Sequence, residues 1–293
     1  MRHLGIPLRI HCWGGLGSQL FTVAMAQKCQ VLFPFKRVII VLHTGGVTYR
    51  APEILELYPD LNYLQINDYL PVIHGALAKK SVHQNSTSVA RIKRYLRVLL
   101  EKSKMVLNAD NTKSFEQIRF WTFSLRGHYS SLPVSEDFLI SLKAKLNQMH
   151  LTQDDSDHNS CGIHYRLGDL VLLDSKKPTP LVAITNEFER RNSVLQFVKT
   201  FIFTDSPELA TSIAHSFKED TVEVPIASTT QTMNSLISME YFIGTSSKIS
   251  FWVAAIRSRI EKKPSSLPAH NRTQMHCLVE EQDSLINYYE IRV

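Results

Sequence analysis

A strand, a helix and a second strand follow one another at the start of the chain. Residues 6–13 (IPLRIHCW) have the apolar character of a strand, residues 18–33 (SQLFTVAMAQKCQVLF) that of a helix, and residues 37–43 (RVIIVLH) that of a β-branched strand. Two strands joined through a helix pair in parallel, because the helix carries the chain back to the edge from which it started. This order predicts an α/β chain with a parallel sheet.

The same alternation begins again in the second half. A polar and acidic segment, residues 147–162, separates the halves and is typical of a connection between domains. Strand-like and helix-like stretches then recur in GIHYRLGDL, VKTFIFTDSPELA, DTVEVPI and SLISMEYFIGTSSKISFWVAAI. The 293 residues suffice for two domains, which we predict at residues 1–150 and 151–293.

Charge and composition restrict the partners. The formal net charge of +6 suits a nucleotide, a phospholipid surface or a nucleic acid, but no nucleic-acid-binding module is recognised, so we expect no nucleic acid. Four scattered cysteines without a CxxC pair predict neither a disulfide framework nor a zinc site, which fits a reducing cytoplasm. Because neither a membrane-spanning apolar run nor a signal peptide is recognised, we expect a cytoplasmic protein.

A basic amphipathic helix is predicted at residues 88–104 (SVARIKRYLRVLLEKSK). Its apolar residues recur at helical spacing, and six lysines and arginines lie between them. Two interpretations stay open: a solvated surface helix, or a helix that contacts an anionic membrane surface.

Three glycines, Gly14, Gly15 and Gly17, lie between the first strand and the first helix. A glycine loop before a helix N-terminus can cradle a phosphate, because the backbone approaches closely and the helix offers unpaired N–H groups. We expect Ser18 to be the helix N-cap. The P-loop and dinucleotide fingerprints both fail, the latter because Leu20 stands where glycine is needed and His43 where an acidic residue is needed. A tight turn without a ligand is the alternative.

Two further segments carry polar groups. In HYRLGD, Arg166 follows a predicted strand, where an α/β sheet faces its ligand and where a planar guanidinium suits a diphosphate. A surface ion pair of Arg166 with Asp169 is the alternative. In TSSKISFW, residues 245–252, hydroxyls and a helix start could hold a phosphate, or could be an ordinary helix cap.

Taken in order, these segments resemble the α1,2-fucosyltransferase family. WGGLGSQLFTVAMA resembles the family's GGLGNQxFxYA segment, RGHYSS its GYxQS segment, and HYRLGD its HxRxGD motif. FTDSPELA resembles its SDDPxWA segment, and SLISMEYFIGTSSKISFWVAA its LMSxCxxxIxxNSTFSWWxA segment. The chain departs from the pattern at Ser18 and Ser246, where the family has Asn, and at Ser206, Lys248 and Phe251.

The resemblance implies a GT-B arrangement, in which two Rossmann-like domains face a cleft. The N-terminal domain would hold the acceptor and the C-terminal domain GDP-fucose, with inversion at the anomeric carbon and neither a metal nor another cofactor. Arg166 would grip the diphosphate, and Asp169 would orient it or act as the base. The other implied contacts are, for the donor, His164, Asp205, Ser246, Ser247, Ser250, Gly14, Gly15 and Gly17, and, for the acceptor, Gln19, His128 and Tyr129. Asp205 could instead cap the helix that follows it.

Without a recognised signal or anchor, the resemblance points to a bacterial enzyme that decorates a lipid-linked polysaccharide repeat unit, such as an O-antigen or a capsule, at the inner membrane face. Two alternatives stay open. The first is a metal-dependent glycosyltransferase that would use the DSD tripeptide at residues 155–157. The second is a non-catalytic protein that binds a nucleotide sugar or a glycan.

Overall fold

The structure is a computed structural model and describes residues 6–45, 49–67, 98–109, 115–149, 159–167, 178–217, 222–271 and 283–291. Contacts divide the chain into two compact units, Met1–Leu132 and Pro133–Val293. Each unit contains one parallel sheet.

The first unit contains a parallel sheet and the helices that connect its strands. Its elements are β1 (Leu8–Trp13), α1 (Leu16–Leu32), β2 (Val38–His43), α2 (Ile54–Leu57), β3 (Tyr63–Ile66), β4 (Val106–Asn108) and β5 (Ser124–Arg126). The sheet order is β3-β2-β1-β5-β4, with every pairing parallel. Strand β1 therefore lies at the centre, and its register sets Trp13 beside His43 at the carboxyl ends of β1 and β2.

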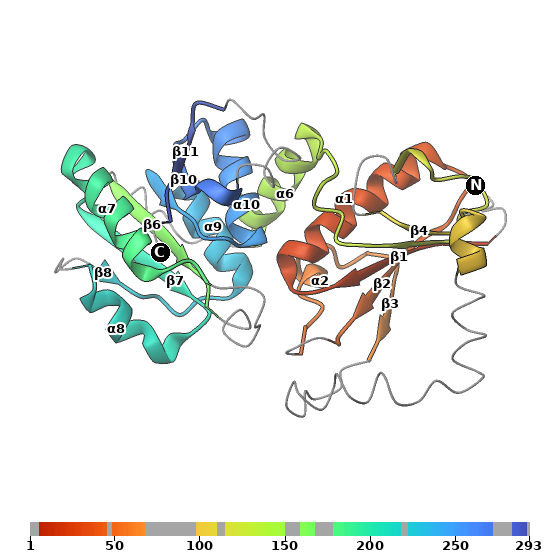
Figure 1. Ribbon diagram of the computed structural model, residues 1–293, viewed down its shortest axis with the longest axis horizontal. Helices are drawn as coiled ribbons and strands as arrows, with labels where there is room; N and C mark the ends of the chain where they lie inside the picture. The colour runs from red at the N-terminus through yellow and green to blue at the C-terminus, as the bar shows by residue number, and fades with distance from the viewer. Residues whose placement is uncertain are drawn as a thin grey trace. The chain divides into compact units, whose positions relative to one another are not determined.

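Helix α1 packs against β1 and β2, as Figure 1 shows. Many of the small and apolar side chains of α1 are buried, among them Leu20, Phe21 and Met25. The N-cap is Gly15, and Ser18 lies inside the first turn, so the expectation that Ser18 caps this helix is wrong. The chain turns into the helix at Gly14, whose φ of +112° is a conformation that side-chain-bearing residues rarely adopt.

The second unit has a larger sheet with helices on both faces. Its strands are β6 (Ser160–Tyr165), β7 (Lys199–Thr204), β8 (Val222–Glu223), β9 (Tyr241–Ile243), β10 (Ser265–Pro268) and β11 (Ile286–Tyr289), in the order β11-β10-β9-β6-β7-β8, all parallel. Its helices are α6 (Glu136–Met149), α7 (Leu181–Leu195), α8 (Ala210–His215), α9 (Thr229–Ser238) and α10 (Lys248–Ile256), with short turns η2 (Pro207–Leu209), η3 (Arg257–Glu261, a π-helix) and η4 (Ala269–Asn271).

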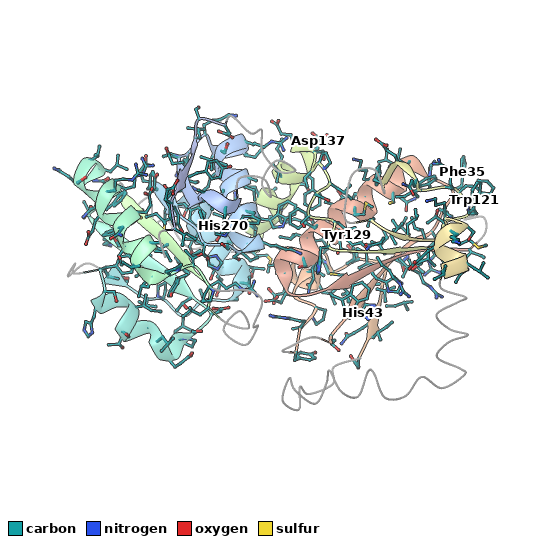
Figure 2. The ribbon with its side chains drawn as sticks, viewed as in Figure 1. Phe35, His43, Trp121, Tyr129, Asp137 and His270 are labelled. Carbon is teal, nitrogen blue, oxygen red and sulfur yellow. The ribbon has the colours of Figure 1, made fainter. Side chains whose placement is uncertain are left out.

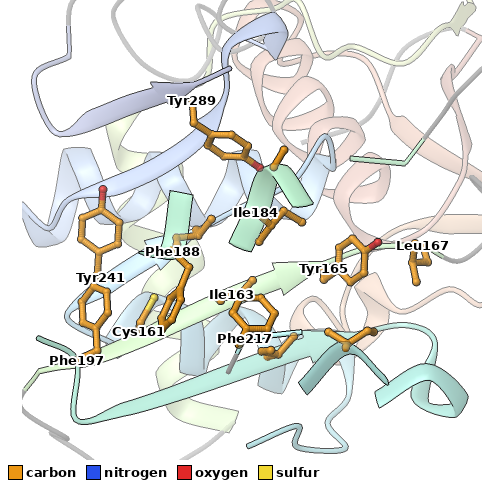
Figure 3. Packing of buried hydrophobic residues seen from close by; sticks show 14 residues of the cluster. Cys161, Ile163, Tyr165, Leu167, Ile184, Phe188, Phe197, Phe217, Tyr241 and Tyr289 are labelled. Atoms are coloured by element: carbon orange, nitrogen blue, oxygen red, sulfur yellow. The ribbon is translucent and has the colours of Figure 1, made fainter. Parts of the chain in front are cut away.

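Strand β6 is buried along its whole length, as expected for a central strand of a parallel sheet. Alternate side chains of this strand, Cys161, Ile163 and Tyr165, join a hydrophobic cluster with α7 and α8, drawn in Figure 3. The other side of β6 faces α9 and α10: there is no room for a side chain at Gly162 beside Met239 and Leu236, and His164 bonds to Ser250.

Helix α10 is apolar on all sides and is buried accordingly. Directly after it, Arg257 is fully buried and donates hydrogen bonds to the carbonyl oxygens of Leu236, Ile237 and Met239, and also to those of Glu240 and Pro264. The carbonyls of residues 236, 237, 239 and 240 lie at the end of α9 and lead into β9, whereas that of Pro264 precedes β10. One guanidinium therefore satisfies groups that the helix end leaves without an internal partner.

The predicted α/β class with two parallel, Rossmann-like sheets is confirmed, and so are the strands and helices expected at β1, α1, β2, β6, β7, β9 and α10. The division between the units lies at Leu132, earlier than the polar segment near residue 150 at which the sequence analysis placed it. The reason is α6, which packs against α9 and α10 and so belongs to the second unit.

Candidate functional site

The carboxyl edge of the second sheet gathers polar side chains from four neighbouring strands. Arg166 directly follows β6, and Asp205 directly follows β7, the strand paired with it. Asp205 accepts a hydrogen bond from the Leu167 amide at 2.8 Å, and its other oxygen lies 3.7 Å from Arg166 Nε. The carboxylate thus fixes the backbone after β6 and lies beside the guanidinium. The Arg166 side chain as a whole is about one-quarter exposed.

The position expected for Arg166 at a strand end is therefore confirmed, while the helix-capping alternative for Asp205 is wrong. Turn η2 has Ser206 as its N-cap, without a side-chain cap bond, and Pro207 as its first residue. Asp169, the other acidic residue of HYRLGD, lies outside the described residues, as does the DSD tripeptide at residues 155–157.

Three polar groups lie together at the ends of β9 and β10. Ser246 Oγ lies 2.7 Å from Nε2 of His270 and 3.4 Å from Oγ1 of Thr179, and the Ser246 amide donates to that Thr179 oxygen. Partial burial lowers the pKa of the His270 imidazole, which is therefore neutral over a wider pH range. His270, labelled in Figure 2, is exposed, which leaves this group accessible at the sheet edge.

Two serines expected to contact the donor have interior positions instead. Ser250 is fully buried; its hydroxyl lies 2.8 Å from His164 Nδ1 and accepts from the Thr245 amide. Ser247 is the N-cap of α10, and its hydroxyl accepts from the Ile249 amide. Both hydroxyls are engaged in hydrogen bonds within the protein, which gives them structural roles.

His164 also has an interior position. Its side chain lies between β6 and α10, and burial, together with the nearby Arg166 charge, lowers its pKa to about 3. The imidazole is therefore neutral at physiological pH and ties the strand that presents Arg166 to the helix that follows β9.

At the carboxyl edge of the first sheet, a carboxylate of the protein itself is bound at the glycine loop. The amide of Leu16, in the first turn of α1, donates to Oε2 of Glu53 at 3.0 Å. A Cβ at Gly15 would lie 3.5 Å from the same oxygen and 3.9 Å from Nη1 of Arg50. Gly17 is buried inside the helix. The predicted phosphate cradle is thus capped by the protein's own carboxylate, a partner favoured at a helix N-terminus.

Two residues expected to contact the acceptor are structural. Gln19 is buried; its amide nitrogen donates to the carbonyls of Gly14 and Ala51, and its oxygen accepts from the Ile54 amide. Tyr129 is buried, with its hydroxyl 2.8 Å from the His11 carbonyl oxygen. Both side chains are therefore held by hydrogen bonds within the first unit. His128, the third, is exposed.

Three aromatic rings stack at the carboxyl ends of β1 and β2. The Trp13 and His43 ring centroids lie 4.4 Å apart with planes 16° apart, and His11 Nδ1 lies 2.9 Å from His43 Nε2. All three side chains are half-buried. Burial, aided by the charge of Arg126 at the end of β5, lowers the pKa of His11 to about 4. We refer to Trp13, His43 and His11 as the ring cluster; His43 is labelled in Figure 2.

Sequence reasoning missed His270 and Thr179 at the second sheet and Glu53 and the ring cluster at the first. His43 was noted only because it fails the dinucleotide pattern. A signal was nevertheless available for Trp13 and His43: both are the last residues of predicted parallel strands, where ligands bind in α/β sheets.

Among the residues that the structure describes, no group of three histidine, cysteine, aspartate or glutamate side chains is placed to hold a metal ion. Within the same residues, no helix has both the length and the apolar character needed to cross a bilayer. Residues 98–102, near the end of the predicted basic segment, are helical, whereas residues 88–97 lie outside the described part.

The chain matches no protein-family model and no curated protein. Among solved structures it is similar to POFUT1 in complex with GDP, at 10% identity and a TM-score of 0.44, over 90% of this chain and 98% of that one. It is also similar to the E. coli heptosyltransferase WaaC with ADP, at 12% identity and a TM-score of 0.46, over 97% and 93% of the two chains. The E. coli ADP-heptose lps heptosyltransferase II matches at 9% identity and a TM-score of 0.46, over 98% and 91%. Likeness at these values is too distant to assign an activity to this chain.

Proposed function

We propose that the protein is an inverting glycosyltransferase that transfers fucose from GDP-fucose to a hydroxyl of a glycan, without a metal ion. The observation that carries the proposal is Arg166. It directly follows the central strand of the second sheet, on the side where parallel sheets bind ligands, and it belongs to the HYRLGD segment that resembles the fucosyltransferase motif.

The reaction needs a cation at that place. The acceptor hydroxyl oxygen forms a bond to the anomeric carbon, its proton passes to a general base, for which we propose Asp169 of HYRLGD, and the bond from that carbon to the diphosphate oxygen breaks. Negative charge therefore grows on the diphosphate. A guanidinium can meet two phosphate oxygens at once, and a positioned charge of this kind stabilises the transition state more than the bound substrate. Asp205, 3.7 Å from Arg166 Nε, orients the guanidinium.

Ser246 and His270 supply further hydrogen-bonding groups at the same edge. The serine hydroxyl and the imidazole nitrogen are 2.7 Å apart and accessible, so each can turn to a phosphate or ribose oxygen when a nucleotide is present. In this proposal the Ser246–His270 pair, rather than Ser247 and Ser250, contacts the donor.

Donor choice is tested by a thermal-shift comparison of GDP, UDP and CMP sugars, because a ligand that binds the native state raises the melting temperature. GDP-fucose should stabilise the protein, and a shift with UDP or CMP sugars alone would rule out the fucosyl donor. Release of GDP in the presence of a glycan, undiminished by EDTA, supports metal-free transfer. Activity lost with EDTA and restored by Mn²⁺ would favour the metal-dependent alternative, and binding without release the non-catalytic one.

We also propose that the acceptor is a lipid-linked glycan of a bacterial surface polysaccharide and that the basic segment 88–104 brings the enzyme to the inner face of the membrane. The support is the sequence pattern alone. Co-sedimentation with anionic liposomes should fall when Arg94 and Arg97 are replaced by glutamine. Unchanged sedimentation would make the segment an ordinary solvated helix.

A further inference from the structure

Large apolar side chains are exposed together at the amino edge of the first sheet. Phe35 lies three residues before β2, Met105 directly before β4, and Trp121 three residues before β5. The amino ends of parallel strands meet at one edge, and a helix that follows a strand ends at that edge, so the last residues of α1 lie there too. We refer to six exposed residues as the amino-edge patch: Val31, Leu32, Phe35, Met105, Phe120 and Trp121.

Hydrogen bonds join the segments that carry this patch. Lys36, which follows Phe35, donates through Nζ to the carbonyl oxygen of Thr122. Trp121 precedes that threonine, and its Nε1 donates to the Ser103 carbonyl oxygen at 3.0 Å. Figure 2 labels Phe35 and Trp121 at the same end of the first unit. The amino-edge patch is therefore one surface, and its tryptophan contacts the end of the basic segment 88–104.

The degree of exposure calls for a partner. Phe120 is 73% exposed and Phe35 is 64% exposed, and the Phe120 and Trp121 ring centroids lie 4.9 Å apart, edge to face. A contiguous exposed apolar patch marks a surface that binds another protein or a membrane. Ligands of a parallel sheet bind at its carboxyl edge, so the proposed reaction does not use the amino edge.

The charge around the patch favours a membrane over a second copy of the chain. The segments 28–37, 98–105 and 115–121 contain six basic and two acidic residues. The basic residues are Lys28, Lys36, Arg37, Lys102, Lys104 and Arg119, and the acidic residues are Glu101 and Glu116. A twofold dimer through this patch would bring the same positive charges together, whereas an anionic headgroup layer attracts them. An exposed indole ring beside basic side chains is also typical of the bilayer interface.

We infer that the amino-edge patch inserts into the interfacial region of an anionic lipid bilayer, with the basic side chains around it at the level of the headgroups. The inference rests on the proposed function, because a lipid-linked acceptor is what requires the enzyme at a membrane. It adds apolar insertion by three separate segments to the attraction proposed for the basic segment.

Quenching of tryptophan fluorescence by brominated lipid tests insertion, because bromine on an acyl chain quenches only a ring that enters the bilayer. The vesicles contain phosphatidylglycerol mixed with acyl-brominated phosphatidylcholine, and vesicles without phosphatidylglycerol serve for comparison. The chain has three tryptophans, at positions 13, 121 and 252. Emission of the parent protein should be quenched by the anionic vesicles, and this quenching should disappear in Trp121→Phe, which keeps an apolar ring and removes the reporter.

Val31 and Val194 provide a matched pair of variants. Each is the last residue but one of its helix, α1 or α7, and the two side chains are 80% and 78% exposed. Val31→Asp and Val194→Asp change the net charge and a helix end in the same way, so a difference in vesicle binding comes from the position of the residue. Val31→Asp should weaken binding at least about tenfold, and Val194→Asp should weaken it much less.

The aromatic residues give a second contrast. Replacing Phe35 and Phe120 by serine should weaken vesicle binding about tenfold for each ring removed, because each loses part of the transfer free energy of a phenylalanine side chain. Both side chains are largely exposed, so the melting temperature should stay close to that of the parent protein.

Three results would overturn the inference. In the first, anionic vesicles bind without quenching Trp121, or do not bind at all; in the second, Val194→Asp weakens binding as much as Val31→Asp. In the third, sedimentation shows a dimer that the two serine substitutions dissociate, which would assign the patch to a second copy of the chain. Failure of the proposed function is read separately, from the absence of GDP release with a soluble glycan. Loss of vesicle binding in the serine variant with GDP release retained would keep both proposals.

Discussion

Replacing Arg166 with alanine separates a role in chemistry from a role in folding. The side chain is about one-quarter exposed, and Asp205 Oδ2 lies 3.7 Å from its Nε. Partly exposed pairs of this kind contribute about 0–1 kcal/mol to the free energy of unfolding. Asp205 also keeps its 2.8 Å bond to the Leu167 amide when the guanidinium is removed. The melting temperature should therefore fall by no more than about 4 °C.

Turnover should respond far more strongly. Loss of one positioned donor to a developing charge lowers turnover by about 10²–10³-fold, whereas GDP affinity, to which other contacts also contribute, should weaken less. Arg166→Lys should restore little, because an ammonium group cannot bond two phosphate oxygens in the planar geometry of a guanidinium.

Arg259→Ala is a matched control in the same unit. The Arg259 side chain is 26% exposed, and its Nη2 also lies 3.7 Å from a carboxylate, that of Glu136. The assay measures GDP release, GDP affinity and a melting curve for the parent and the three variants. Near-parental turnover in a folded Arg166→Ala protein, or an equal loss in Arg259→Ala, would refute the assignment of Arg166 to the leaving diphosphate.

Three further predictions concern stability. The pKa of His164 is lowered to about 3 in the folded protein and is about 6.5 in the unfolded chain, so the unfolded state binds more protons as pH falls from 6.5 to 3, and the free energy of unfolding decreases over that range. In His164→Asn, the urea midpoints at pH 7 and pH 5 should therefore differ less than in the parent protein. An equal difference would contradict the buried neutral imidazole. Gly14→Ala should lower the free energy of unfolding by about 1–3 kcal/mol, since φ is +112° and the new Cβ would lie 2.9 Å from Ser18 Oγ. The control Gly15→Ala, at a position with φ −75°, should have a melting temperature close to that of the parent protein. Arg257→Met should lower the free energy of unfolding, measured in urea, by at least about 3 kcal/mol, because several buried carbonyls lose their hydrogen-bond donor. A small decrease would show that water replaces the guanidinium.

The pattern of apolar and polar residues along the chain was sufficient to predict the parallel sheets of this protein. The segment that became β2 is a continuous β-branched run, those that became β1, β6 and β7 combine apolar and polar residues, and the segment between β1 and β2 has helical character. The α/β class and the parallel sheets could therefore be predicted from neighbouring residues. The place of Arg166 followed as well, because the buried run of β6 ends at Tyr165, and a strand end in a parallel sheet faces the ligand side.

Residue type alone did not separate the serines of TSSKISFW. Ser246 is accessible beside His270, whereas Ser250, four residues later, is fully buried against His164. The sequence shows the same hydroxyl at both positions. Which of them faces a ligand depends on the direction in which α10 leaves the sheet and on what packs over it.

Only the tertiary structure decides which residues that are distant in the sequence form hydrogen bonds with one another. Glu53 reaches the Leu16 amide from 37 residues away, Ser250 meets His164 across 86 residues, and the Tyr129 hydroxyl meets the His11 carbonyl across 118. A local pattern records whether a residue is polar and how its own segment folds, but the segment it meets is chosen by the order of strands in the sheet and by the packing of helices upon it. The glycine loop shows the consequence: its sequence fixes a tight turn into a helix, and only the fold brings a carboxylate to the amide that a phosphate would otherwise bind.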